Sequence, residues 1–555
     1  MKKLTLSVAF IMMLQLTFAG GLLTNYNQSA QYIRMMSRNA SLEIDAVFYN
    51  PAGLVKLENG WHFGVYNQTI FQEKTVNSGF PLLNDGEYIG EVKAPVFPSA
   101  YGVYKKDKWA FSLGFGPVGG GGSAEFERGL PSFEIPITKV VPGLAGLSQI
   151  DPSLSVTGYD ADLYFKGSSV FWGIQVGATY AINDVISVYG GARILPSKNA
   201  YQGYIRNVQL KVAGQSYPAP GWLSQTAGVV NNIASQANAG ANTMYDAANM
   251  MQPVIDNNLG GLTLAELEAN SVISPEIRAQ VEGGLQLMGI PPEQIGVMNV
   301  TQIQGAYNAA GDQLTATAGT LSTTGATLGA TSSQLEDREV DTEQTGTGIT
   351  PILAINISPN DDWNIAVKYE HKTYMDLTNS TTVDDLGLFP DGGKSNSDMP
   401  GNLAIGVGYR GLDWLEAQLS YNTYFDKRVN WGGNVRYNAV GESVQRQIDN
   451  NYYEVALGLQ FNLADNFALS VGGLRSKTGV AENWQSDFSY SNSSVTLGGG
   501  IMWKITDRLT LDAGVSNTFY EEDEVNFTDP DVGAYTDLYN KSTISFAAGI
   551  SYSIF

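Results

Sequence analysis

The chain ends in ISFAAGISYSIF, residues 544–555, and this stretch alternates between two kinds of side chain. Even positions from Ile544 to Ile554 are apolar or aromatic, and the odd positions between them are Ser, Ala or Gly. Successive side chains of a strand point to opposite faces, so the pattern predicts a strand with one apolar and one small, mostly polar face. Phe555 is out of phase with the apolar series, which predicts a bulge or a frayed end.

The N-terminus has the features of a secretory signal. Lys2 and Lys3 precede the apolar run Leu4–Leu16, and Thr17-Phe18-Ala19 supplies small residues at the expected cleavage point. We therefore expect residues 1–19 to be a signal peptide that is cleaved after Ala19. No later run of about 20 apolar residues follows, so membrane-spanning helices are not expected.

Alternating stretches recur along the chain and are joined by short turns rich in Asp and Asn, which favour turns. The turns are Lys105–Lys108, Ile182–Val185, Ser358–Asp362, Gly411–Asp413, Ala464–Asn466 and Thr506–Arg508. Six turns join six strand pairs. A first strand near Gly60–Phe71 and the final strand bring the number to about 14, an even number as in bacterial barrels.

These observations predict an all-β fold, a closed transmembrane antiparallel β-barrel over residues 59–555 in the bacterial outer membrane. Open sheet edges are not tolerated in lipid, so closure is expected. Aromatic residues cluster beside the short turns, where an interfacial girdle belongs, which puts the short turns on the periplasmic side and the long loops outside. They are Trp109, Tyr180, Trp363, Tyr409, Trp414, Phe461, Phe467 and Trp503.

Composition excludes several classes of function. The net charge of −22 argues against nucleic acid as a partner, and the lack of cysteine excludes thiol catalysis and thiolate metal sites. The two histidines, His62 and His371, are expected to be structural, so we predict no enzyme. No cofactor or metal is predicted, because the acidic runs 521–524 and 391–398 are interpreted as solvated loop tips in preference to calcium sites.

One loop, residues 207–340, is far longer than the others and has helical patterns. Thr263 with Glu266 fits a capping box, and Ser274-Pro275 begins an amphipathic pattern. Apolar residues recur every seven positions from Val300 to Leu335. We expect a helical extracellular insertion. It is either a cap on the barrel rim or an apolar helix pair that catches hydrophobic ligands.

About forty residues, 20–58, lie between the signal and the first strand, and they match neither the signal-peptide pattern nor the alternation of a strand. A barrel of about 14 strands has a lumen that needs closing, so we expect this segment to fold inside as a plug, or hatch. Asn50-Pro51-Ala52 within this segment, its distance from the signal, and the strand count resemble the FadL-type outer-membrane transporters of long-chain fatty acids and other hydrophobic compounds. The resemblance covers hatch and barrel but not the large loop.

The resemblance implies a 14-stranded barrel with a hatch that contains Asn50, Pro51 and Ala52, and sideways exit of ligand at an inward kink of the third strand. That strand begins at Trp109 and continues into a stretch rich in glycine with one proline. Such residues break or bend strands, because proline lacks a ladder donor and glycine weakens pairing. These residues are Gly116, Pro117, Gly119, Gly120, Gly121 and Gly122. They predict a lateral opening, although the start of a long loop would also use glycine.

Two cations are expected on the lumen side of their strands, Arg193 and Lys368. Near an apolar pocket they could bind a carboxylate head group. The alternative is a lumen salt bridge to a strand carboxylate such as Glu370, Glu416 or Glu454.

The leading hypothesis is passive uptake of long-chain fatty acids or other hydrophobic molecules. External loops would capture the ligand, an internal apolar pocket would hold it, and it would leave beside the third strand. The expected partners are this ligand, outer-membrane lipid and the barrel-assembly machinery. The alternatives are a scaffold or shuttle barrel of a secretion system, a polar diffusion porin and, more remotely, an outer-membrane hydrolase.

Overall fold

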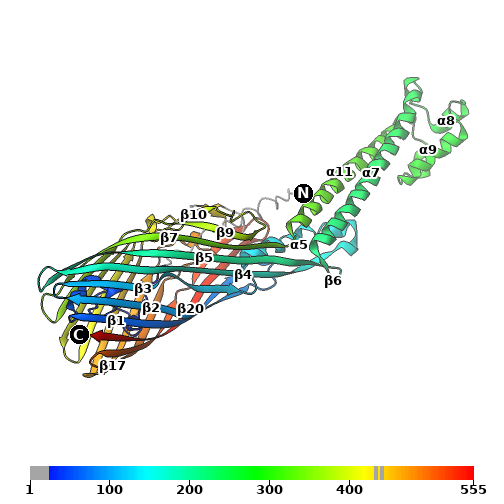
Figure 1. The fold of residues 1–555 in the computed structure, drawn as a ribbon. Coiled ribbons are helices and arrows are strands. Elements are labelled where there is room, and N and C mark those ends of the chain that lie inside the picture. Colours follow the sequence, from blue (N-terminus) through cyan, green and yellow to red (C-terminus); the bar gives the residue numbers. More distant parts are fainter. Residues whose placement is uncertain (1–23, 431–434, 438–442) are drawn as a thin grey trace. The chain divides into compact units, whose positions relative to one another are not determined.

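The computed structural model describes residues 24–430, 435–437 and 443–555, and the predicted signal peptide lies outside them. Fourteen antiparallel strands form a closed barrel (Figure 1), which confirms the predicted fold class. They are β1 Gly60–Ser78, β2 Glu87–Lys106, β3 Trp109–Phe126, β4 Val156–Ala181, β5 Ile186–Val212, β7 Arg338–Ile357, β8 Trp363–Glu370, β11 Asn402–Leu412, β12 Leu415–Tyr424, β15 Tyr452–Ala464, β16 Phe467–Lys477, β17 Ser494–Thr506, β18 Leu509–Tyr520 and β20 Gly533–Ile554.

The last strand closes the barrel against the first. β20 pairs with β1 from Ile554 opposite Trp61 to Asp537 opposite Ser78. All six predicted short turns join neighbouring barrel strands. Phe555 lies beyond β20, with its ring centroid 6.0 Å from that of His62.

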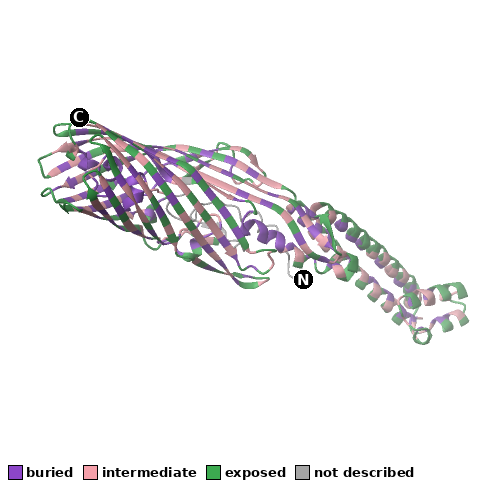
Figure 2. Cartoon of the chain, turned by 90° about the horizontal axis from the view of Figure 1, so that it is seen from below, coloured by how far each residue is buried: buried purple, intermediate pink, exposed green. Residues whose placement is uncertain are grey.

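The outer surface of the barrel is apolar. Figure 2 shows exposed and buried residues alternating along the strands, and on β20 the exposed set includes Ile544, Phe546 and Ile554. Trp109 and Trp363 beside the short turns are exposed, and each contacts a tyrosine of the adjacent strand, Tyr180 at 4.6 Å and Tyr409 at 4.7 Å between ring centroids. This arrangement is the aromatic girdle of a membrane barrel.

The remaining elements of the barrel unit are short. Its additional strands are β9 Asp376–Asp384, β10 Lys394–Asn396, β13 Val435–Tyr437, β14 Ser443–Gln445 and β19 Asp523–Asp529. Its helices are α2 Ala30–Met35, α3 Ala46–Tyr49, η1 Pro51–Lys56, α4 Pro131–Thr138, α5 Val140–Gly143, α6 Leu147–Ile150, η2 Pro152–Leu154, η3 Asp426–Arg428 and η4 Glu482–Trp484. In the described part of the chain no helix is long and apolar enough to span a membrane.

Residues 208–336 form a separate helical unit between β5 and β7. Its two long helices, α7 Ala219–Asp256 and α11 Val300–Gln334, run side by side (Figure 1). The capping box of Thr263 and Glu266 is present at the start of α8. The unit also contains β6 Gln215–Pro218, α8 Leu264–Ala269, α9 Pro275–Leu287 and α10 Pro292–Ile295.

The hatch helix α2 lies against the inner wall of β15–β18, on a row of glycines. Gly458, Gly472 and Gly498 are directly opposite one another on three adjacent strands. A Cβ atom at Gly472 would lie 2.0 Å from the carbonyl oxygen of Met35, and one at Gly498 would lie 2.4 Å from that of Ile33. The hatch backbone therefore approaches the wall more closely than any side chain allows.

Gly472→Val should displace the hatch, because overpacking a close contact costs about 1–3 kcal/mol. We expect faster trypsin cleavage within the hatch and a higher ion conductance in planar bilayers. The matched control is Gly473→Val, since a Cβ atom on that neighbouring glycine has its nearest contact at 3.5 Å. Equal behaviour of the two variants would contradict this account of the glycine row.

Candidate functional site

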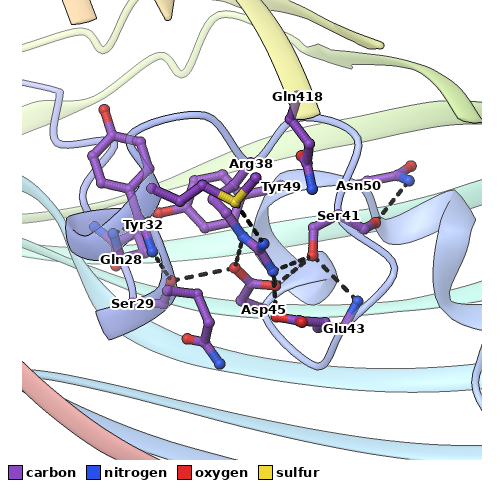
Figure 3. Close-up of polar contacts among 12 residues, drawn as sticks. Gln28, Ser29, Tyr32, Arg38, Ser41, Glu43, Asp45, Tyr49, Asn50 and Gln418 are labelled. Atoms are coloured by element: carbon purple, nitrogen blue, oxygen red, sulfur yellow. Dashed lines mark hydrogen bonds and ion pairs between the residues drawn. The ribbon is translucent and has the colours of Figure 1, made fainter. Parts of the chain in front are cut away.

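A buried ion pair organises the hatch itself (Figure 3). Arg38 donates to both carboxylate oxygens of Asp45, at 2.7 and 2.8 Å, and Ser41 Oγ donates to the same carboxylate at 2.5 Å. Arg38 also contacts Glu43 Oε2 at 2.6 Å. Partial burial would raise the pKa of the Glu43 carboxyl, but Arg38 and Arg34 outweigh it and lower that pKa.

Other hatch side chains fasten the hatch to the barrel wall. Arg34 is fully buried and donates to Asp512 Oδ1 at 2.9 Å and to Gln460 Oε1 at 2.6 Å. Asn39 Nδ2 donates to Asn422 Oδ1 at 3.0 Å. These bonds reach β18, β15 and β12, so the hatch is held by several strands of the wall.

The Asn50-Pro51-Ala52 segment is anchored to the wall near the short turns. Asn50 Nδ2 donates to Asn356 Oδ1 at 2.7 Å and to the Ser41 carbonyl oxygen at 3.0 Å. The carbonyl oxygens of Pro51 and Ala52 accept wall hydroxyl groups at 2.7 and 2.6 Å. The donors are Thr179 of β4 and Ser187 of β5.

The two predicted lumen cations share one carboxylate. Arg193 contacts both oxygens of Glu370, at 2.6 and 3.0 Å, and Lys368 Nζ lies 2.7 Å from Glu370 Oε1. Lys368 also donates to the Phe48 carbonyl oxygen at 2.7 Å, and both cations lie over the Phe48 ring. These contacts match the salt-bridge alternative and tie the cations to the hatch. Their role in head-group binding stays a prediction.

The ladder between β2 and β3 is interrupted. Ala100–Lys106 pair with Phe115–Trp109, and Gly90–Val92 pair with Phe126–Ala124. Within the described residues, no ladder pair joins 93–99 of β2 to 116–123 of β3. The interruption begins after seven paired residues from the short turn, inside the roughly 9–11 residues that a tilted strand needs to cross a membrane.

Both edges of this interruption carry residues that disfavour pairing. On β3, register shifts against β4 occur between Pro117 and Gly119 and between Gly120 and Gly122. Gly120 and Gly122 have φ values of +74° and +105°, which favour glycine. On β2, Pro95 and Pro98 lack the N–H that a ladder needs. We did not predict these two prolines, although their spacing within a strand is a readable signal.

The start of the hatch bonds to the free edge of β3. Thr24 forms an antiparallel bridge with Gly119, Asn25 N donates to the Val118 carbonyl oxygen at 2.8 Å, and Gln28 Nε2 donates to that of Pro117 at 2.7 Å. On the other edge, Tyr101 OH donates to the Gln28 carbonyl oxygen at 2.8 Å. The hatch therefore supplies hydrogen bonds that a neighbouring strand would supply elsewhere.

A cavity of about 450 Å³ lies inside the barrel, beside this interruption. It is bordered by hatch residues Thr24–Asn27 and by Gly120 and Gly122 of the bent strand. Its lining includes the apolar side chains of Ile33, Met36, Ile70, Val92, Phe97, Phe126, Phe165 and Leu474. Hydroxyl groups from β16–β18 and two lysines, Lys74 and Lys541, also line it. We did not predict these lysines either.

The residues considered for catalysis do not form a catalytic arrangement. His62 lies between Ser553 Oγ and the Glu58 carbonyl oxygen, each at 2.9 Å, and His371 Nδ1 lies 3.0 Å from Tyr369 OH. In the described ranges no group of three or more His, Asp or Glu side chains is placed to hold a metal ion.

Fold and site together define a transmembrane β-barrel with an internal hatch. A Pseudomonas aeruginosa FadL homologue of known structure has a similar fold, with a TM-score of 0.53 and 12% identity over 97% of this chain and 100% of that chain. The toluene transporters TodX of P. putida (11% identity) and TbuX of Ralstonia pickettii (12% identity) align over 92% of this chain and 94% of theirs, each with a TM-score of 0.45. No protein-family model and no curated protein matches the sequence. The likeness to the FadL homologue establishes the fold.

Asp45→Asn should loosen the hatch, because it leaves Arg38 buried without its main counter-ion, at a cost of about 3–5 kcal/mol. We expect a lower temperature for the onset of protease cleavage in the hatch. Glu91→Gln removes an exposed pair with Lys93, which water and salt screen, and should leave the onset temperature of cleavage unchanged. A hatch that stays protected in Asp45→Asn would refute the organising role of this ion pair.

Proposed function

We propose that this barrel takes up hydrophobic small molecules across the bacterial outer membrane by passive transport, with long-chain fatty acids as the leading class. The observation that carries the proposal is an internal cavity that borders an interrupted strand pair in the membrane wall. The cavity volume falls within the range of about 300–1,000 Å³ that is usual for small-molecule sites. The fold shared with a FadL homologue supports the same function.

In this proposal, the ligand is captured at the extracellular loops, enters the cavity above the hatch and leaves sideways between β2 and β3. Gly116–Gly122 form the bent edge of the exit. Asn50, Pro51 and Ala52 anchor the base of the hatch, so that its opposite end, Thr24–Gln28, moves when the exit opens. Arg193 and Lys368, held by Glu370 and Phe48, keep the hatch core in place, and a head-group contact during passage is their second proposed role.

A disulfide across the interruption tests the exit. The chain has no cysteine, and a Cβ atom built on Gly122 would lie 3.3 Å from Cβ of Ala94, close to the spacing of about 3.5–4.5 Å in disulfides. In cells without their own fatty-acid transporter, oxidised Ala94→Cys/Gly122→Cys should take up radiolabelled oleate several-fold more slowly than wild type, because the two edges can no longer separate. A reductant should restore the uptake.

Two controls distinguish the effect of cross-linking the exit from the effect of the substitutions themselves. Val103→Cys/Ser112→Cys links the same two strands where they are already paired, and it should transport normally in both redox states. Gly122→Cys alone measures the strain of a side chain at a positive φ. Normal oleate uptake by fully cross-linked Ala94→Cys/Gly122→Cys would rule out exit between β2 and β3.

The alternatives predict different results for the unmodified protein. A polar diffusion porin should conduct ions steadily in planar bilayers, whereas a barrel filled by its hatch should conduct little. A scaffold or shuttle barrel should purify from the outer membrane with a large partner and should not change oleate uptake when it is deleted. Strong ion conductance would therefore contradict this proposal in favour of a porin. Oleate uptake that is unaffected by deletion of the protein would contradict it in favour of a scaffold or shuttle barrel.

A further inference from the structure

Five cationic residues form an arc along the extracellular rim of the barrel, at the ends of the strands from β8 to β16. Lys372 follows β8, Lys427 and Arg428 follow β12 in η3, and Arg475 and Lys477 are at the end of β16. These strands are neighbours in the wall, in the order β8, β11, β12, β15 and β16. The cationic arc therefore stands out in a chain whose net charge is −22.

The cationic arc lies at the upper boundary of the membrane. Lys372 is nine residues beyond Trp363, which belongs to the girdle beside the short turns, and a tilted strand crosses a membrane in roughly 9–11 residues. The exposed ring of Tyr369 lies 6.5 Å from that of Phe425, between centroids, and Phe425 directly precedes η3. Exposed aromatic rings at a strand end mark the interface between membrane and water. The arc is therefore level with the lipid head groups of the outer leaflet.

The central part of the cationic arc is one continuous surface. Asn402 of β11 pairs with Glu370 on one side and with Tyr424 on the other, so β8 and β12 end at the same height. Lys372 Nζ donates to the Arg428 carbonyl oxygen at 3.3 Å. The residue that follows β8 therefore contacts the segment that follows β12.

Lys427 and Arg428 are exposed and have no carboxylate to neutralise them. Across the described ranges, no carboxylate oxygen lies within 4.0 Å of either cationic group. Lys427 Nζ donates to the Asp449 carbonyl oxygen at 2.5 Å. In the same ranges the Arg428 guanidinium has no hydrogen-bond partner, so all of its donors remain available to a ligand.

The flanks of the cationic arc are only partly neutralised. Lys372 Nζ lies 2.7 Å from Asp398 Oδ2. Arg475 and Lys477 share the carboxylate of Glu521, at 2.5 and 3.7 Å, so two cations there have one counter-ion.

The rim formed by β2–β7 shows the usual arrangement, in which exposed cations pair with carboxylates. The pairs are Lys93–Glu91, Lys166–Glu125, Lys198–Glu343 and Arg206–Glu339. The unpaired Arg428 thus departs from the pattern of the other rim, at a height where lipid phosphate groups lie.

We propose that the cationic arc docks the phosphorylated glycolipid of the outer leaflet, a lipid A-type molecule with a phosphorylated disaccharide and several acyl chains. A guanidinium can bind a phosphate group through two parallel hydrogen bonds, which is the role assigned to Arg428. Lys427 adds a second charge, and clusters of basic residues at a membrane surface bind anionic lipid head groups. The acyl chains would lie along the outer wall below, where Leu419 and Leu457 are paired across β12 and β15 and half exposed. This surface is independent of the proposed uptake function.

The test compares bisphosphorylated lipid A with dephosphorylated lipid A, by native mass spectrometry of the full-length protein in an uncharged detergent. Wild type should bind the bisphosphorylated lipid about tenfold more tightly. Lys427→Gln/Arg428→Gln should bind both lipids equally, with binding of the dephosphorylated lipid unchanged. The matched control is Lys93→Gln/Lys198→Gln, which removes the same charge from paired positions of the other rim and should keep the preference. An excess of inorganic phosphate should not displace the lipid, because it makes no contact with the apolar wall.

Each outcome decides the inference. Equal binding of both lipids to wild type, or a preference that survives Lys427→Gln/Arg428→Gln, would overturn the docking surface. An equal loss of preference in the matched control would show an effect of overall charge and would overturn it too, as would displacement of the lipid by inorganic phosphate. If the double variant fails to fold, judged by heat-modifiable migration in a gel, Arg428→Gln alone decides. It should bind bisphosphorylated lipid A several-fold more weakly than wild type, and unchanged binding would overturn the proposal.

Discussion

The bilayer contains no water to satisfy backbone N–H and C=O groups, and the rest of this structure depends on that constraint. A membrane-crossing sheet has to close on itself, and β20 closes on β1 from Asp537 to Ile554 to do so. An interruption between barrel neighbours within the membrane part of the wall is the stretch between β2 and β3, where the ladder stops after Lys106–Ala100 and resumes at Val92. The barrel tolerates this interruption because another part of the chain supplies partners.

That part is the start of the hatch. Thr24, Asn25 and Gln28 bond to the exposed edge of β3 from inside, and the Gln28 carbonyl oxygen accepts a hydroxyl group from β2. Any movement of this segment leaves backbone groups of β3 without partners, so hatch position and wall integrity are coupled. Because Thr24–Asn27 also border the cavity, a molecule that fills the cavity would contact the same segment. In the proposed uptake mechanism, this coupling keeps the wall closed until a ligand competes with the hatch for the space.

How far the sequence predicts this structure depends on how local each feature is. Strand alternation and Asp- or Asn-rich turns are local, so the barrel of 14 strands, the six short turns and the closing strand were all predictable, as was the capping box at Thr263. The irregular pairing of the third strand was also predictable, since Pro117 and the glycines of Gly116–Gly122 disfavour a ladder by themselves. Lateral opening at these residues stays a prediction. The contribution of β2 through Pro95 and Pro98 was missed. Two prolines within one strand do signal weak pairing, but only the placement of β3 shows which ladder they interrupt. Features that depend on register between distant strands could not be predicted. Lys74 and Lys541 are unremarkable in the sequence, and only the pairing of the first strand with the last brings them together.

Two sets of cations inside one barrel show how surroundings decide what a charge does. Arg193 and Lys368 are almost fully buried, they share Glu370, and they bond to the hatch, so their charge is balanced within the protein and contributes to holding the hatch. Lys74 and Lys541 are half-buried, face each other and border open space lined by hydroxyl groups. A buried cation without a counter-ion would cost several kcal/mol, which explains why the first set needs Glu370. The second set has no carboxylate oxygen within 4.0 Å in the described ranges, so its charge is offset mainly by the ring and the carbonyl oxygen of Tyr490. The distance to a carboxylate therefore decides whether a lumen cation fastens the hatch or stays only partly compensated.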